Sequence, residues 1–172
     1  MILLWDLYWP VLAAGLGAGV AFGWPALKDE DGDLRRRLLV IAAGAAAAMA
    51  AAALWHGPAG TADSFAATVE SDARAELERL DMGAVNVRLE RGPMRRSLVL
   101  DGPADAFQRR ELRRLMDETV GIADARWETQ PGGLTLPLIV EAMLASLVAF
   151  SFGLLFAYLV VLRRRANASW RW

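Results

Sequence analysis

Few residues of this chain could carry catalytic or metal chemistry. Its 172 residues include no cysteine and a single histidine, His56. Thiolate nucleophiles, disulfides and cysteine-based or histidine-rich metal sites are therefore excluded. No glycine-rich phosphate loop follows a predicted strand, because the glycines between Gly15 and Gly19 lie inside an apolar stretch. We expect no enzymatic activity, no cofactor and no small-molecule substrate.

Two acidic residues, Asp6 and Glu141, lie inside otherwise apolar stretches, where a polar side chain often marks function. Each lies within about one to two helical turns of the end of its stretch, so contact with interfacial water explains both. The alternatives are a contact between them or with an arginine of a partner. A proton pathway would need ionisable groups deeper in the stretches, and the sequence has none.

His56 follows Trp55 at the end of the second apolar stretch, with Ala52 four residues earlier. This spacing is similar to the small residue and histidine of antenna polypeptides that ligate a chlorophyll-type pigment. Alanine is so frequent in this stretch that chance accounts for the spacing, and nothing specifies partners around the ring. His56 is the one candidate cofactor ligand, and we expect it to bind none.

Arginines are frequent in the central part of the chain, and acids such as Glu90, Asp105 and Glu111 lie between them. An ordinary solvated surface is one interpretation. Contact with anionic lipid or a partner is the other, since each basic residue near an anionic membrane can add about 1 kcal/mol. The formal net charge of −1 does not favour nucleic-acid binding. The candidate contact residues are Arg95, Arg96, Arg109, Arg110, Arg113 and Arg114.

Apolar residues make up 55% of the chain and are concentrated in three stretches. These are Ile2 to Leu27, Leu38 to Trp55 and Pro137 to Leu162. Each approaches or exceeds the roughly 20 residues needed to cross a hydrocarbon core about 30 Å thick. The sequence therefore predicts an α-helical membrane protein with three transmembrane helices.

Basic residues predict the orientation of these helices, because cytoplasmic links are rich in lysine and arginine. The first link carries Lys28 and residues 35–37, and the tail carries residues 163–165 and Arg171. Both should be cytoplasmic, which places the amino terminus and the central segment outside. A cleaved signal peptide is the alternative for the amino terminus, but it would need a basic start that this chain lacks.

Small residues recur every four positions in the first and third stretches, forming smooth rows that another helix backbone can approach closely. The second stretch is almost wholly alanine and glycine from Ala42 to Ala53, which suits a tight hairpin with the first. The rows either join the three helices to each other or bind a neighbouring membrane subunit. They comprise Gly15, Gly19 and Gly23, and Ala149, Gly153 and Ala157.

The central segment shows the periods of a small α/β domain. A helix is expected from about Thr61, capped by Thr61, Asp63 or Ser64 and ending by Asp81. Its apolar face would include Leu80, and its exposed acids are Glu70, Asp72, Glu76 and Glu78. Alternating residues then predict a hairpin around Arg91-Gly92-Pro93. A second helix follows, with Leu112, Leu115, Met116, Thr119 and Val120 on one face; it should end at Gly121, before a third strand over 122–128.

Residues from about 62 to 128 resemble the BON domain of bacterial envelope proteins. The matching residues are Val85-Asn86-Val87-Arg88-Leu89, Leu98-Val99-Leu100-Asp101-Gly102 and Val120-Gly121-Ile122-Ala123-Asp124-Ala125-Arg126-Trp127. The departures from its pattern are Asp101 before the turn glycine and Ile122 after the helix-end glycine. The resemblance implies an α-β-β-α-β module without enzymatic activity, linked to binding of phospholipid or of an envelope partner. Fold alone does not establish that function.

These observations predict a two-span hairpin over 1–56, a periplasmic BON-like domain over 57–136, and a third span with a basic tail over 137–172. The expected location is a bacterial inner membrane. The first functional hypothesis is a non-catalytic accessory or scaffolding subunit of a larger membrane complex, with an energy-transducing complex as one candidate. The alternative is a free-standing envelope-maintenance protein whose domain binds phospholipid. The expected partners are membrane lipids and other membrane subunits.

Overall fold

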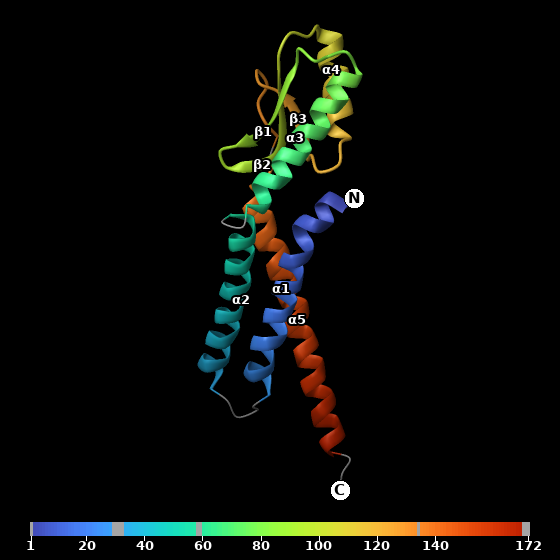
Figure 1. The fold of residues 1–172 in the computed structure, drawn as a ribbon. Helices are drawn as coiled ribbons and strands as arrows, with labels where there is room; N and C mark the ends of the chain where they lie inside the picture. The colour runs from blue at the N-terminus through green and yellow to red at the C-terminus, as the bar shows by residue number, and fades with distance from the viewer. Residues whose placement is uncertain (1, 29–32, 58–59, 134, 170–172) are drawn as a thin grey trace. The chain divides into compact units, whose positions relative to one another are not determined.

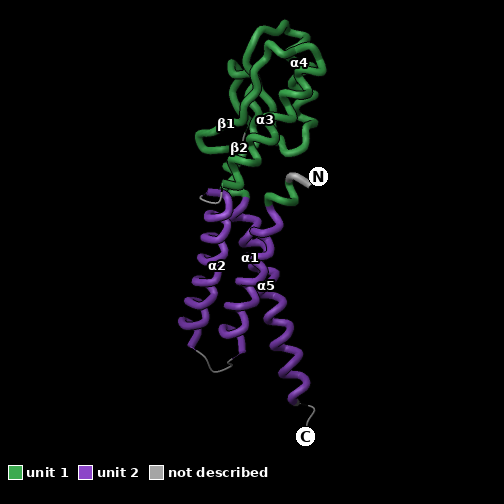
Figure 2. The backbone as a smooth tube through the Cα atoms, viewed as in Figure 1, with its two compact units in different colours: residues 1–7, 60–141 green, residues 8–59, 142–172 purple. Residues whose placement is uncertain are grey.

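The computed structural model describes residues 2–28, 33–57, 60–133 and 135–169 (Figure 1). Arg171, part of the basic tail that indicated orientation, lies outside these residues. The backbone divides into two compact units, and Figure 2 colours them separately. Residues 8–59 and 142–172 form a helical unit, and residues 1–7 and 60–141 form an α/β unit.

Three long helices dominate the chain: α1 (Ile2–Leu27), α2 (Leu34–His56) and α5 (Leu138–Ser169). Their 26, 23 and 32 residues correspond to about 39, 35 and 48 Å at about 1.5 Å per residue. Each is long and apolar enough to cross a membrane. This confirms three long apolar helices that could span a membrane, although α2 begins before the predicted stretch and α5 continues beyond it.

The polar first turn of α2 is helical because Asp33 caps it. The Asp33 carboxylate accepts a hydrogen bond from the backbone N–H of Arg35 at 3.1 Å. A side-chain acceptor at this position satisfies one of the amides that a helix start leaves unpaired. The helix therefore includes the basic residues 35–37, which apolarity alone assigned to the link.

The α/β unit contains α3 (Thr61–Arg79), β1 (Asn86–Arg91), β2 (Met94–Asp101), α4 (Ala106–Asp117) and β3 (Asp124–Trp127). The strands form a three-stranded sheet in the order β1-β2-β3. β1 and β2 are an antiparallel hairpin, and β3 pairs parallel to β2 after the crossover through α4. The predicted order of helix, hairpin, helix and strand is present in the structure.

One face of the sheet forms the core of this unit with α3 and α4. Alternate residues of β1 and β3 are buried, as a period-two pattern predicts, whereas β2 at the centre of the sheet is buried without alternation from Ser97 to Leu100. Helix α3 contributes a row at helical spacing. The Trp127 indole N–H donates to the backbone carbonyl of Arg109 at 2.9 Å and so ties β3 to α4. The core residues are Phe65, Val69, Ala73, Leu77, Val85, Val87, Leu89, Leu98, Leu100, Leu112, Met116, Ala125 and Trp127.

Helix α4 ends earlier than predicted. Its last residue is Asp117, and the chain turns through hydrogen bonds from Thr119 N–H to Met116 and from Ile122 N–H to Thr119. Val120, expected on the buried face, is 52% exposed, so that prediction was wrong. The helical period could not reveal that the chain must turn here to reach β3.

Three predictions for α3 were also wrong. Its N-cap is Gly60 in a left-handed conformation without a side-chain cap bond, in place of Thr61, Asp63 or Ser64. Leu80, expected on the buried face, is 38% exposed because the helix ends at Arg79. Glu70, expected to be exposed, has only 15% of its side chain exposed because it contacts β1.

The turn after α4 provides a test of the α/β unit. Gly121 has a φ of +99°, and an added Cβ would lie 3.3 Å from atoms of Phe65 and Val69. Strain and contact together should make Gly121→Ala destabilise this unit by about 1–3 kcal/mol. Gly83→Ala is the matched control, because that Cβ would meet no atom within 4 Å. Hydrogen exchange of core peptides in the full-length protein measures the change, and equal effects of the two variants would contradict it.

Candidate functional site

The closest contact in the helical unit is between α1 and α5. A Cβ on Gly19 would overlap with the backbone carbonyl of Phe150 and lie 2.8 Å from the Cα of Gly153. A Cβ on Gly153 would likewise overlap with the carbonyl of Leu16. Only glycine permits this approach of two helix backbones at both positions.

The remaining residues of the predicted rows extend this contact along both helices. Gly15 lies against Ser146 and Ala149, and Gly23 lies against Leu154 and Ala157. The rows of α1 and α5 therefore contact each other within the chain. In this arrangement neither row is an open surface for another subunit.

Helix α2 directs a row of its own toward the other two helices. Gly44, Ala48, Ala52 and His56 are buried at every fourth position. A Cβ on Gly44 would lie 2.7 Å from Phe22. The Ser146 hydroxyl, itself fully buried, donates a hydrogen bond of 2.9 Å to the backbone carbonyl of Ala48. All three helices are thus joined through small residues. Interhelical hydrogen bonds add to this contact, from Ser146 of α5 to α2 and from Arg165 of α5 to the carbonyl of Leu27 in α1.

The opposite side of α2 is exposed, and between the exposed residues Leu39 and Leu54 it consists of alanine. We call this part the outward alanine face. No residue that the structure describes covers it. By contrast, the exposed side of α5 carries large side chains such as Phe152, Leu155 and Leu159. The outward alanine face comprises Ala42, Ala43, Ala46, Ala47 and Ala50.

His56 is enclosed by the protein at the end of α2. Its Nδ1 lies 3.2 Å from the carbonyl of Ala52, and its ring centroid is 6.2 Å from that of Tyr8. Its Nε2 is buried, without a hydrogen-bond partner among the described residues. A planar pigment has no access to a nitrogen enclosed in this way. The described residues also contain no group of three or more potential metal-ligating side chains.

Most of the candidate arginines already have partners within the α/β unit. Arg95 pairs with Glu90, Arg113 with Asp117 and Asp124, and Arg114 with Glu111 and Glu118. Arg109 donates to the carbonyl of Ala104 and lies over the Trp127 ring, 5.0 Å from its centroid. Arg110 is exposed and makes no ion pair with any described residue.

Arg96 pairs with Glu141, the acidic residue in the first turn of α5. Its Nε donates to Glu141 at 2.9 Å and its Nη2 donates to the other carboxylate oxygen at 3.3 Å. This two-point contact is the strong geometry for arginine and carboxylate. The sequence favoured interfacial water for Glu141, with an arginine of a partner as one alternative, and in the structure the chain itself supplies the arginine. Asp6 instead lines a small hollow with Thr61, Ser64 and Thr68.

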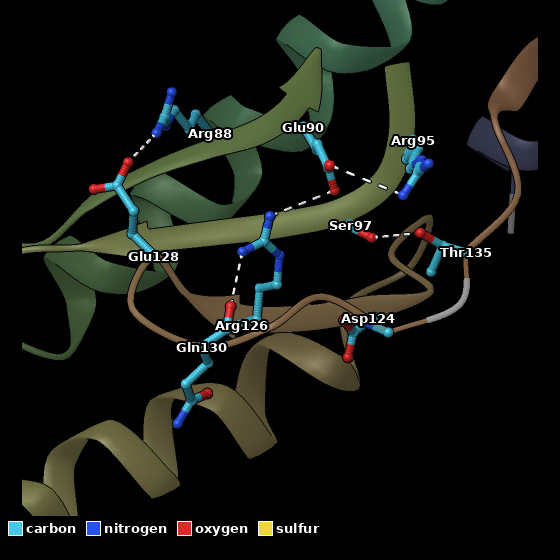
Figure 3. A network of polar contacts seen from close by, with 10 residues as sticks. Arg88, Glu90, Arg95, Ser97, Asp124, Arg126, Glu128, Gln130 and Thr135 are labelled. Carbon is cyan, nitrogen blue, oxygen red and sulfur yellow. Dashed lines mark hydrogen bonds and ion pairs between the residues drawn. The ribbon is translucent and has the colours of Figure 1, made fainter. Parts of the chain in front are cut away.

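The sheet face opposite the helices is covered by ion pairs. Figure 3 shows Arg88 paired with Glu128, and Glu90 between Arg126 and Arg95. These pairs surround Val99, which is only 4% exposed. A hollow of about 420 Å³ lies here, and its charged groups are already paired. The sequence signal for this network is the pair of opposite charges two residues apart, Arg88 and Glu90 in β1 and Arg126 and Glu128 at the end of β3, and the network was not predicted.

Comparison with known proteins assigns no family or function to the chain. No family model, curated protein or solved structure matches this chain.

The contact between α1 and α5 predicts a sharp difference between neighbouring glycines. Gly19→Leu should destabilise the helical unit by about 1–3 kcal/mol or more, because the added side chain meets backbone atoms that cannot move aside. Gly17→Leu should be tolerated, since a Cβ there meets nothing within 4 Å. Thermal unfolding in detergent and the amount of protein in membranes measure both. Equal behaviour of the two variants would exclude this helix contact.

Proposed function

We propose that this chain is a non-catalytic, multi-pass inner-membrane protein that acts as an accessory or scaffolding subunit of a larger membrane complex. The observation that carries the proposal is the outward alanine face of α2. The small-residue rows of α1 and α5 contact each other within the chain, and we assign the partner helix to α2.

The chemistry of this face supports binding of a helix. Inside a membrane, lipid tails are as apolar as leucine, so helices associate through close packing and not through a hydrophobic driving force. Alanine at neighbouring positions allows a second backbone to come close, whereas the large side chains on α5 favour contact with lipid. We assign α2 to the partner and the exposed side of α5 to lipid. An energy-transducing complex is one candidate for the assembly.

The α/β unit is proposed to be a BON-like domain that contacts the same complex or another envelope component. Its order of helix, hairpin, helix and strand agrees with the α-β-β-α-β order of that family. The turn glycines of the resembling segments support this assignment. Gly102 and Gly121 both have positive φ, at +143° and +99°, which other residues rarely adopt.

A second candidate is a free-standing envelope-maintenance protein that binds phospholipid through this domain. Phe107 on α4 is 64% exposed, and Arg110 follows it at the spacing that places both side chains on one helix face. An aromatic ring beside an unpaired guanidinium suits an anionic lipid surface. The other candidate arginines contribute less to this function because acids or carbonyls already engage them.

Copurification distinguishes the two functions. The tagged protein, extracted in gentle detergent, should carry a stoichiometric set of membrane proteins. A double variant, Ala46→Leu and Ala50→Leu, should lose them, because the added side chains separate the partner backbone from α2. Gly17→Leu, which adds the same side chain to an exposed position of α1, should retain them. Mass spectrometry and sizing measure recovery.

The other outcomes of the same experiment are informative. Retention of all partners by the double variant would exclude the alanine face as the binding surface. A protein that purifies alone with anionic lipid would support the envelope-maintenance function.

The proposed orientation places the amino terminus and the α/β unit in the periplasm and the carboxyl terminus in the cytoplasm. Its support is the basic residues at 35–37 and 163–165, at the ends of α2 and α5 that would be cytoplasmic. Reporter fusions at Arg165 should be active only for a cytoplasmic reporter, and fusions at the exposed Gly83 only for a periplasmic reporter. The reverse pattern would invert the topology.

A further inference from the structure

Both edges of the small sheet have a carboxylate at their centre. An edge strand directs alternate backbone N–H groups away from the sheet, where another strand can bind them. On β1, the N–H of Leu89 donates to the Glu70 side chain of α3 at 2.9 Å. On β3, the N–H of Ala125 donates to the Asp117 side chain of α4 at 2.5 Å.

An arginine lies beside each carboxylate, and at Glu70 it holds the carboxylate in place. Glu70 accepts two hydrogen bonds from Arg91, at 3.0 and 2.9 Å, and its side chain is 15% exposed. Asp117 lies 3.9 Å from Arg113. Immediately before β1, the N–H of Val85 is also engaged, because it donates to the carbonyl of Met82. The outward N–H groups on both sides of Val87 are therefore taken.

The charges of β1 indicate which strand would otherwise bind this edge. If β1 of a second copy paired antiparallel with Leu89 at the centre, Arg88 of each copy would lie opposite Glu90 of the other. Opposite charges at facing positions stabilise strand pairs. Glu70 occupies the amide at the centre of this most complementary register.

We propose that Glu70 blocks the β1 edge by accepting the Leu89 N–H, and so prevents β1 from pairing with β1 of a second copy of this chain. Asp117 has the corresponding role at the β3 edge. The proposal concerns the α/β unit alone and does not depend on the accessory-subunit function, whose partner surface lies on α2.

The test compares full-length variants in detergent by light scattering and sizing. Glu70→Ala removes the acceptor and should double the protein mass of the particle relative to the wild type. Glu70→Gln keeps a carbonyl oxygen for the Leu89 N–H and should retain the wild-type mass. Glu78→Ala is the matched control, because it removes an exposed acid of the same helix.

A double variant tests the register. Adding Arg88→Glu to Glu70→Ala places two acids opposite each other, and the mass should return to the wild-type value. A folded Glu70→Ala protein with wild-type mass would overturn the proposal. Association that persists with Arg88→Glu would also overturn it, because aggregation of an unfolded domain does not depend on that pairing.

Discussion

The helical unit depends on one steric constraint, the contact between the backbones of α1 and α5. Gly19 and Gly153 meet at a distance that leaves no room for a Cβ on either residue. In lipid, where burial of apolar surface does not favour helix association, the energy of this contact comes from packing of backbone atoms. The Ser146 hydroxyl adds a hydrogen bond to α2 from the same region of α5. The three helices therefore share one interface of small residues.

The charged side chains of the α/β unit are likewise engaged mainly by other residues of the same unit. Arg88 and Glu90 of β1 pair across β2 with Glu128, which follows β3, and with Arg126 of β3, so charged side chains of the unit cover the open face of the sheet. Isolated surface pairs of this kind each contribute about 1 kcal/mol or less. Their greater effect is to remove unpaired charge from the surface, which narrows the set of residues that could attract anionic lipid. Arg110 remains, beside the exposed Phe107.

The sequence predicted the parts of this structure that depend on periodicity. It did not predict element ends and side-chain burial where a single long-range contact determines them. The bounds of α1 and the alternation of Val85, Val87 and Leu89 follow from hydrophobic pattern alone. Val120 matched the helical period but lies in a turn that the path to β3 requires. Glu70 looked like any other acid on α3, because no local signal shows which helix position faces a strand edge.

The small-residue rows of α1 and α5, which were the candidate helix-packing sites, also could not be assigned to a partner from local sequence. Spacing identified the small residues of α1 and α5, but spacing cannot say whether a row faces another part of the same chain or a different protein. In the structure these rows face each other, and the alanine positions of α2 between its buried residues remain exposed. The rows that were easiest to recognise thus explain how the chain folds. We therefore propose the outward alanine face of α2 as the surface for a partner inside the membrane, because alanine leaves space for the backbone of another helix and no described residue covers it.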